Sequence, residues 1–320
     1  MKGNVKWWQY YYPLIGGHRK DGYKNQDTLT NYGIAGATIE QIVEKSPEKS
    51  SMAKLVLGET GDSAINQALA QQPTFLSIWV GHNDILKAVT RTNTALMTST
   101  EAFTDSLEKM AAKIKQTPSV QGVVIANIVD LTALPYLTDV NSAAHPQNSK
   151  RSFLLSSENQ LSADQVLDPT ELKQIQQQII AYNQALKTIA KDNNWAYVDL
   201  HAFFAKINQE DYQLKDSKGF STNTTINSGY LGGLVSLDGM HITSTGQAIF
   251  AKRKTPCLAT LSTQGQNKLK RQNHVQFGLS PTSLNLPQHN KLITFIEDTR
   301  HEHIIHCRLI GNRLIHRNDR

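Results

Sequence analysis

Asp238 and His241 are the pair of side chains in this sequence best suited to acid–base chemistry. A carboxylate three residues before an imidazole can accept the Nδ1 proton of the ring, fix its tautomer and leave Nε2 as a base toward a hydroxyl. The same spacing also suits a structural role, because Asp-Gly forms turns and a histidine can cap the helix that follows. Spacing alone favours the structural role, so the rest of the sequence has to decide between them.

A second group of polar residues follows the apolar run FLSIWV, residues 75–80. The run predicts a strand buried on both faces, and it stops at Gly81 in front of Asn83 and Asp84. In an open parallel sheet, ligands and catalytic groups collect at the carboxyl ends of strands. Asn83 can donate a hydrogen bond there without carrying a charge, whereas Asp84 is expected to end the strand and tie down the next loop.

The elements that must position these residues alternate along the chain. Apolar periodicity predicts helices, and continuous apolar runs predict strands. The predicted helices cover residues 39–43, 64–71, 101–116, 170–193 and 245–251, and the further strands cover 122–129 and 195–200. This order predicts an α/β fold with a mainly parallel sheet. The long polar insertion at 131–168 is typical of a lid or of disorder, and the composition of 219–233 predicts a mobile loop.

Three tracts of the sequence, GIAGAT, WVGHND and SLDGMHITSTGQ, resemble the GDSL-type or SGNH hydrolases, a family of esterases and lipases. Gly36, the Gly81 to Asp84 tract and the Asp238 to His241 tract occur in the family's order. Supporting matches are AYN at 181–183 and VDL at 198–200. The resemblance covers roughly residues 30 to 251, and an ordered set is far more specific than any one motif. It implies a flavodoxin-like, three-layer α/β/α sandwich.

The resemblance also implies a role for each matched residue. His241 would be the general base and Asp238 its orienting partner, while the Gly36 backbone N–H and the Asn83 side-chain amide would line an oxyanion hole. Donors fixed where negative charge develops are each worth roughly 3 kcal/mol in the transition state. A glycine suits the site because a backbone without Cβ can approach the substrate oxygen closely. No cofactor or metal is implied.

The nucleophile of the family, a Ser in a Gly-Asp-Ser motif before the glycine, has no counterpart in residues 1–35, which contain no Ser. We therefore expect the fold to be incomplete at the N-terminus and leave the nucleophile unknown. A Gly-Asp-Ser does occur at 61–63, after Gly36. Ser63 is the weakest candidate of the set, because Asp62 or Ser63 is better explained as the cap of the helix that follows.

The net charge of +6 on 320 residues comes from the C-terminal part of the chain. Residues 252–320 contain 12 Lys and Arg against 4 Asp and Glu, together with both cysteines and six of the eleven histidines. We expect an irregular segment at 1–29, an SGNH-like domain at 30–251 and a basic tail at 252–320. The tail is interpreted as disordered or as a lost reading frame, with polyanion binding as the alternative. It has no motif for specific nucleic-acid recognition.

The sequence thus predicts a carboxylester hydrolase that, without an identified nucleophile, is weakly active or inactive as printed. The alternatives are a catalytically dead remnant or binding module on the same fold, and polyanion binding through the tail. The substrate would be a small-molecule or lipid ester. No apolar run approaches the length of a membrane span, and the N-terminus lacks the apolar region of a signal peptide. Family members are often secreted or periplasmic, so the compartment stays open, as do acyl specificity and oligomeric state.

Overall fold

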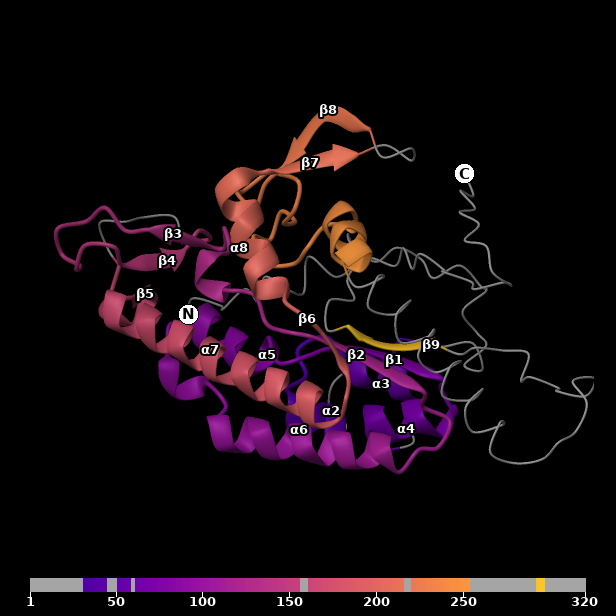
Figure 1. Cartoon of the computed structure of the whole chain (residues 1–320). Helices are drawn as coiled ribbons and strands as arrows, with labels where there is room; N and C mark the ends of the chain where they lie inside the picture. The colour runs from indigo at the N-terminus through magenta and orange to yellow at the C-terminus, as the bar shows by residue number, and fades with distance from the viewer. Residues whose placement is uncertain are drawn as a thin grey trace, which may run out of the picture. The chain divides into compact units, whose positions relative to one another are not determined.

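A parallel four-stranded sheet with the order β6-β2-β1-β9 lies between helices in the part of the chain that the structure describes (Figure 1). In this computed structural model the strands are β1 (Phe75–Trp79), β2 (Gly122–Ala126), β6 (Ala196–Val198) and β9 (Leu292–Ile296). Every residue of β1 and of β2 is buried. Largely apolar runs of this kind suit strands that are covered on both faces. The predicted α/β class with a mainly parallel sheet is therefore confirmed.

The structure describes residues 31–44, 51–58, 61–155, 161–215 and 220–253, and the backbone of 292–296. All of them belong to the larger of two compact units, Asn31–Arg320. The predicted irregular segment, 1–29, lies outside the described residues, and so does most of the predicted basic tail, 252–320. From the tail, residues 292–296 supply strand β9. The boundaries of the three predicted segments stay predictions.

Helices cover both faces of the sheet (Figure 1). One layer contains helices that contact one another, namely α2 (Ile39–Val43), α4 (Ala64–Ala70), α6 (Thr100–Lys115) and α7 (Pro169–Asp192). The opposite layer contains α8 (Leu200–Glu210) and a helix over residues 244–253. Phe250 of that last helix packs against Trp79 of β1 and Phe203 of α8, with ring centroids 5.5 and 5.8 Å apart. The three-layer α/β/α sandwich is thus confirmed.

Local sequence signals explain where the main helices begin. Asp168 accepts hydrogen bonds from the backbone N–H groups of Thr170 and Glu171, and Pro169 occupies the first helical position of α7. Strand β6 is shorter than predicted, because Asp199 caps α8 and so ends the extended chain. Two helices were not predicted as such, α3 (Ser51–Leu57) and α5 (Asn83–Thr90).

The insertion at 131–168 contains a small antiparallel sheet in the part that the structure describes. Its strands are β3 (Leu137–Asp139), β4 (Lys150–Ser152) and β5 (Val166–Leu167), with short 3-10 helices at Leu131–Ala133 and Ala163–Gln165. The prediction of a loop at 219–233 is wrong for its first half, because β8 (Ser221–Ile226) pairs with β7 (Tyr212–Lys215). Threonine is a good strand former, and the small polar residues around it conceal that preference.

Candidate active site

Asp238 and His241 lie on one tight turn that closes a short loop before the helix at 244–253. Asp238 Oδ2 is 2.5 Å from His241 Nδ1, and Oδ1 accepts hydrogen bonds from the backbone N–H groups of Met240 and His241, both at 3.0 Å. The backbone N–H of Ser236 donates to the His241 carbonyl at 2.7 Å. The turn therefore fixes the imidazole through Nδ1 and directs Nε2 away from the carboxylate.

The Asp238 carboxylate is held in its charged form. Burial alone would raise the pKa of Asp238, but hydrogen bonds from the His241 ring and from the Ser236 hydroxyl outweigh it, and the charge of His241 adds to them. The pKa of this carboxyl therefore lies well below its usual range. The Ser236 hydroxyl, 2.6 Å from Oδ1, was not singled out in the sequence. In the sequence, only the position of Ser236 two residues before Asp238 pointed to this contact.

Gly36 lies in a turn directly before helix α2. The backbone N–H of Ala37 donates to the Ile34 carbonyl at 3.1 Å, and Gly36 has a φ of +80°. These are the marks of a type II turn, whose third residue requires a positive φ and is therefore usually glycine. A Cβ built on Gly36 would meet no atom within 4 Å. Among the described residues, glycine is therefore required at this position by its positive φ and not by a lack of space for a side chain.

Asn83 is the first residue of α5, two residues after Gly81 and four after the end of β1. Its side chain is 8% exposed, and it makes no hydrogen bond within the described part of the chain. The Asn83 amide can therefore donate to a group that the described residues do not supply. The bend between β1 and α5, which we call the Asn83 corner, requires glycine at position 81. Gly81 has a φ of +103°, and a Cβ there would lie 2.7 Å from Ile128 Cδ1.

Asp84 connects the Asn83 corner with the Gly36 turn. Its Oδ2 accepts a hydrogen bond from the backbone N–H of Ile39 at 3.0 Å, and its Oδ1 accepts one from the Thr98 hydroxyl at 2.9 Å. Asp84 was expected to tie down the loop that follows the strand. Helix α5 follows the strand directly, and Asp84 bonds Thr98 in the segment after that helix as well as Ile39, which begins α2 and lies 45 residues earlier in the chain.

Ser63 is buried and caps helix α4, as predicted. Its side-chain oxygen accepts from the Asn66 backbone N–H at 3.4 Å, and Asp62 bonds the Asn66 side chain at 2.8 Å. The structure thus accounts for the Gly-Asp-Ser at 61–63 by local capping. Within the described ranges, no hydroxyl is hydrogen-bonded to Nε2 of His241.

The predicted residues fall into two groups. One is the Asp238–His241 pair, and the other is Gly36 with Asn83, joined through Asp84. The first group packs beside the segment that leaves the carboxyl end of β2, since the Tyr136 backbone N–H donates to the Gly239 carbonyl at 2.9 Å. The second group follows the carboxyl end of β1. The second group therefore lies at the edge of the sheet where catalytic groups are expected, whereas the first is placed by its contact with Tyr136 of the insertion.

Exposed apolar residues adjoin, along the chain, the Asp238–His241 turn and the aromatic rings packed near it, and we call them the apolar rim. Phe153 lies under Gly239, where a Cβ would be 3.0 Å from its ring, and it contacts Tyr230 with centroids 5.4 Å apart. The rim consists of Leu154, Tyr230, Leu231 and Leu237, which are 70, 50, 72 and 69% exposed. Leu231 also has a φ of 63°, an unfavourable conformation for a bulky residue. Strain of this kind is often kept at functional sites.

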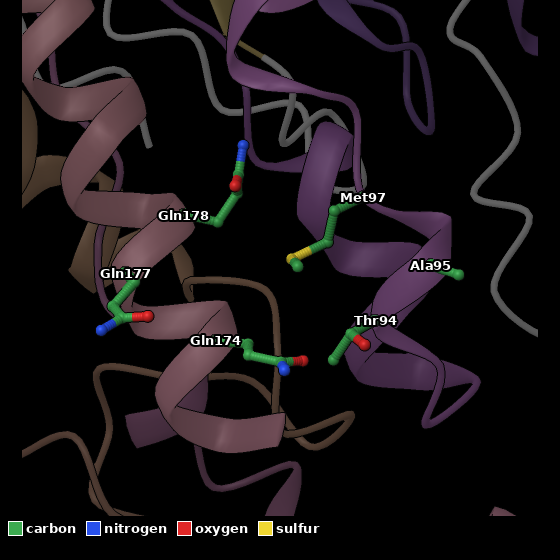
Figure 2. A pocket seen from close by; sticks show the side chains of 6 residues that line it. All are labelled: Thr94, Ala95, Met97, Gln174, Gln177 and Gln178. Carbon is green, nitrogen blue, oxygen red and sulfur yellow. The ribbon is translucent and has the colours of Figure 1, made fainter. Parts of the chain in front are cut away.

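A separate hollow of about 410 Å³ lies between α7 and the 3-10 helix Thr94–Leu96 (Figure 2). Three glutamine amides, a threonine and a methionine face it, and none of the predicted site residues does. The lining residues are Thr94, Ala95, Met97, Gln174, Gln177 and Gln178. It offers no base, and we place the candidate site at the Asp238–His241 turn. Within the described ranges, no group of three His, Cys, Asp or Glu side chains could hold a metal ion.

Comparison with known proteins places the chain among ester hydrolases. The profile of the GDSL-like lipase/acylhydrolase family matches residues 2–253. That span contains Gly36, Asn83, Asp238 and His241, and it includes nearly all of the segment predicted as irregular. A comparison with curated protein sequences gave no match.

Several solved structures resemble the chain at low identity. The acetylxylan esterase Axe2 of Geobacillus stearothermophilus is 16% identical over 68% of this chain and 66% of its own, with a TM-score of 0.36. The α/β hydrolase LAE5 from the metagenome of Lake Arreo is 14% identical over 71% of this chain and 70% of its own, with a TM-score of 0.38. A protein described as a GDSL-like lipase from Parabacteroides merdae is 14% identical over 69% and 68%, with a TM-score of 0.35.

Proposed function

The chain belongs to the GDSL-like lipase/acylhydrolase family, an ester hydrolase family, and from that membership we propose that His241, Asp238, Gly36 and Asn83 form its hydrolytic site. The single observation that supports these roles best is the geometry of the turn. Asp238 holds Nδ1 of His241 at 2.5 Å, and Nε2 has no hydrogen bond within the described residues. An imidazole that is oriented at one nitrogen and open at the other is suited to general-base catalysis.

In the proposed reaction, His241 Nε2 takes the proton of a hydroxyl as its oxygen attacks the ester carbonyl. The carbonyl oxygen becomes an oxyanion, which accepts hydrogen bonds from the Gly36 N–H and the Asn83 amide. When the tetrahedral intermediate collapses, the alcohol oxygen leaves and takes the proton from His241. Asp238 stays charged throughout and stabilises the imidazolium, a role that fits its lowered pKa.

The identity of the hydroxyl is the open part of this proposal. In the family it belongs to a serine, and the one Gly-Asp-Ser of this chain is accounted for as a helix cap. Water can replace the serine, at a much lower rate, because the oxyanion hole and substrate binding retain roughly 10³- to 10⁴-fold catalysis without a nucleophile. We therefore propose slow turnover of activated esters by the 320-residue chain.

The apolar rim supports a substrate with an apolar group beside the ester. Leu237 directly precedes Asp238, and Tyr230 reaches the turn through its ring contact with Phe153. Exposed leucines next to a base provide a surface for an acyl chain, whereas a purely sugar-like substrate would be matched by polar groups and flat aromatic faces. We propose acyl chains longer than acetyl as the preferred class.

The test is hydrolysis of p-nitrophenyl acetate and butyrate by the purified chain. Wild type should hydrolyse both slowly, and His241→Ala should lower kcat at least about 100-fold, because a general base contributes 10²- to 10⁴-fold. His145→Ala is the matched control, since that ring bonds the Leu161 carbonyl in the insertion and lies outside the proposed site. A folded chain without His241-dependent turnover would favour the catalytically silent binding module. Loss of activity in Ser63→Ala, with folding retained, would make Ser63 the nucleophile.

A further inference from the structure

Asp84 is a buried carboxylate between the two proposed oxyanion donors. It is 1% exposed and directly follows Asn83. Its Oδ2 accepts from the Ile39 N–H, three residues after Gly36. A buried charge is tolerated only where hydrogen bonds replace its water. The Ile39 backbone and the Thr98 hydroxyl each supply such a hydrogen bond to Asp84.

The connection to Gly36 is short and stiff. Ile39 is the first residue of α2, and the capping box of Thr38 and Gln41 fixes the start of that helix. Thr38 alone separates the type II turn, residues 34–37, from this start. A hydrogen bond to Ile39 therefore controls where the Gly36 N–H lies relative to Asn83.

A second set of contacts anchors Asp84 from the opposite side. The Thr98 backbone N–H donates to the Asp84 carbonyl at 3.0 Å, and the Thr98 carbonyl accepts from Tyr182 and, at 3.2 Å, from Gln178. Tyr182 is fully buried on α7 and stacks on Phe103 of α6. Asp84 is thus fixed to the helical layer, and the Gly36 turn is fixed to Asp84.

We propose that Asp84 is a positioning residue that sets the separation of the Gly36 N–H and the Asn83 amide. The inference rests on the proposed function, because it assigns those two groups to one oxyanion hole. Such donors must lie 2.7–3.1 Å from the oxyanion, and a displacement of about 1 Å lowers the rate on the order of 100-fold. The carboxylate itself does not touch the substrate.

The first test compares Asp84→Asn with wild type by two measurements. Hydrogen–deuterium exchange of the peptide covering residues 34–39 should become faster, because a neutral amide holds the Ile39 N–H less strongly. The kcat for p-nitrophenyl acetate should fall about 10- to 100-fold with KM changed less than about 3-fold, since the oxyanion hole acts in the transition state. Ser99→Ala is the matched control, because Ser99 also caps a helix N–H, at 3.2 Å, but belongs to α6.

A second pair of variants removes the donor and leaves the carboxylate intact. Ile39→Pro lacks the N–H, and proline is tolerated at the first helical position, where Thr38 already has an extended conformation. Ile39→Ala loses similar packing but keeps the N–H. Ile39→Pro should show the larger loss of kcat and the faster exchange of the Gly36 turn.

The outcomes separate the two proposals. If wild type hydrolyses no ester, the proposed function fails, and the exchange measurement still decides whether Asp84 holds the turn. If Asp84→Asn and Ile39→Pro leave exchange of residues 34–39 unchanged relative to Ser99→Ala and Ile39→Ala, the positioning role is wrong. Faster exchange with an unchanged kcat would also overturn it.

Discussion

Gly36 illustrates how one residue can be recognised for one reason and required for another. The sequence suggested a glycine because the backbone must approach a substrate oxygen. The structure places it at the third position of a type II turn with a φ of +80° and open space at the Cβ position. The turn leaves the Gly36 N–H without a partner among the described residues, so the same conformation both demands glycine and presents the donor.

Asp238→Asn is the residue-scale prediction. The variant should lose roughly 10²- to 10⁴-fold in kcat, because an amide no longer selects the tautomer with a free Nε2 or stabilises the imidazolium. It should also remove a pH-dependent part of the stability. The folded-state pKa of Asp238 lies below its ordinary value of 3.8, so the carboxylate stabilises the fold above that value. This contribution is lost as the pH falls from there toward the folded-state pKa.

The measurement is urea unfolding of both proteins at about pH 7 and about pH 3. The difference in free energy of unfolding between wild type and Asp238→Asn should be larger at the higher pH. An equal difference at both values would show that the pKa of Asp238 is not lowered. Asp164→Asn, at an exposed position in a short 3-10 helix, provides the control for a general effect of removing one carboxylate.

At the scale of elements, the insertion after β2 and the loop after β8 meet at the catalytic turn. Tyr136 and Phe153 of the insertion contact Gly239, and Tyr230 of the later loop contacts Phe153. Neither segment has a readable motif. Their side chains nonetheless form the apolar rim, because both are anchored by short antiparallel ladders, β3-β4-β5 and β7-β8.

The rim supplies the element-scale prediction. Leu231→Ser combined with Leu237→Ser should lower kcat/KM for p-nitrophenyl octanoate about 10-fold or more, because each buried methylene contributes about 0.8 kcal/mol. Activity on the acetate should change little, since its acyl group does not extend beyond the carbonyl carbon and one methyl. Leu96→Ser is the matched control, as an exposed leucine, 40% accessible, on the 3-10 helix beside the separate hollow. Equal losses on acetate and octanoate would contradict an acyl-binding role.

At the scale of the whole molecule, the sheet joins parts of the chain that are far apart. β9 pairs with β1 in parallel over five residue pairs, from Phe75–Leu292 to Trp79–Ile296. β1 is thereby flanked on both edges and carries the Asn83 corner at its end. The tail was interpreted as disordered, as a lost reading frame or as a polyanion-binding segment, and most of it lies outside the described residues.

The whole-molecule prediction concerns this strand. Removing residues 254–320 should lower the thermal midpoint of unfolding, because one edge of β1 would lose its hydrogen-bonding partner. Ile293→Pro and Thr294→Pro form a sharper pair: successive N–H groups of a strand point to opposite sides, so one proline removes a bond to β1 and the other does not. Unequal destabilisation of the two variants is expected, and an unchanged stability in both would argue against the β1–β9 pairing.

Salt-dependent binding of a nucleic acid that persists without the tail would rule out polyanion binding through the tail.

The sequence by itself determined the class of fold and the family, because these depend on local signals. Buried strands appear as apolar runs, helices as apolar stripes between caps, and the Asp238–His241 turn as a spacing of three residues. Each signal is complete within a few residues, since the interactions that produce it are made within one turn or one strand. Capping by Ser63 could be predicted for the same reason.

Only the tertiary structure decided how these pieces meet. The Asp84–Ile39 hydrogen bond joins residues 45 apart, and the β1–β9 ladder joins Phe75 to Leu292. The Phe153–Tyr230 ring contact likewise joins the insertion to the loop after β8. No local pattern encodes such contacts, because they form only when the packing of the whole sheet and its helices brings distant segments within hydrogen-bond or van der Waals distance.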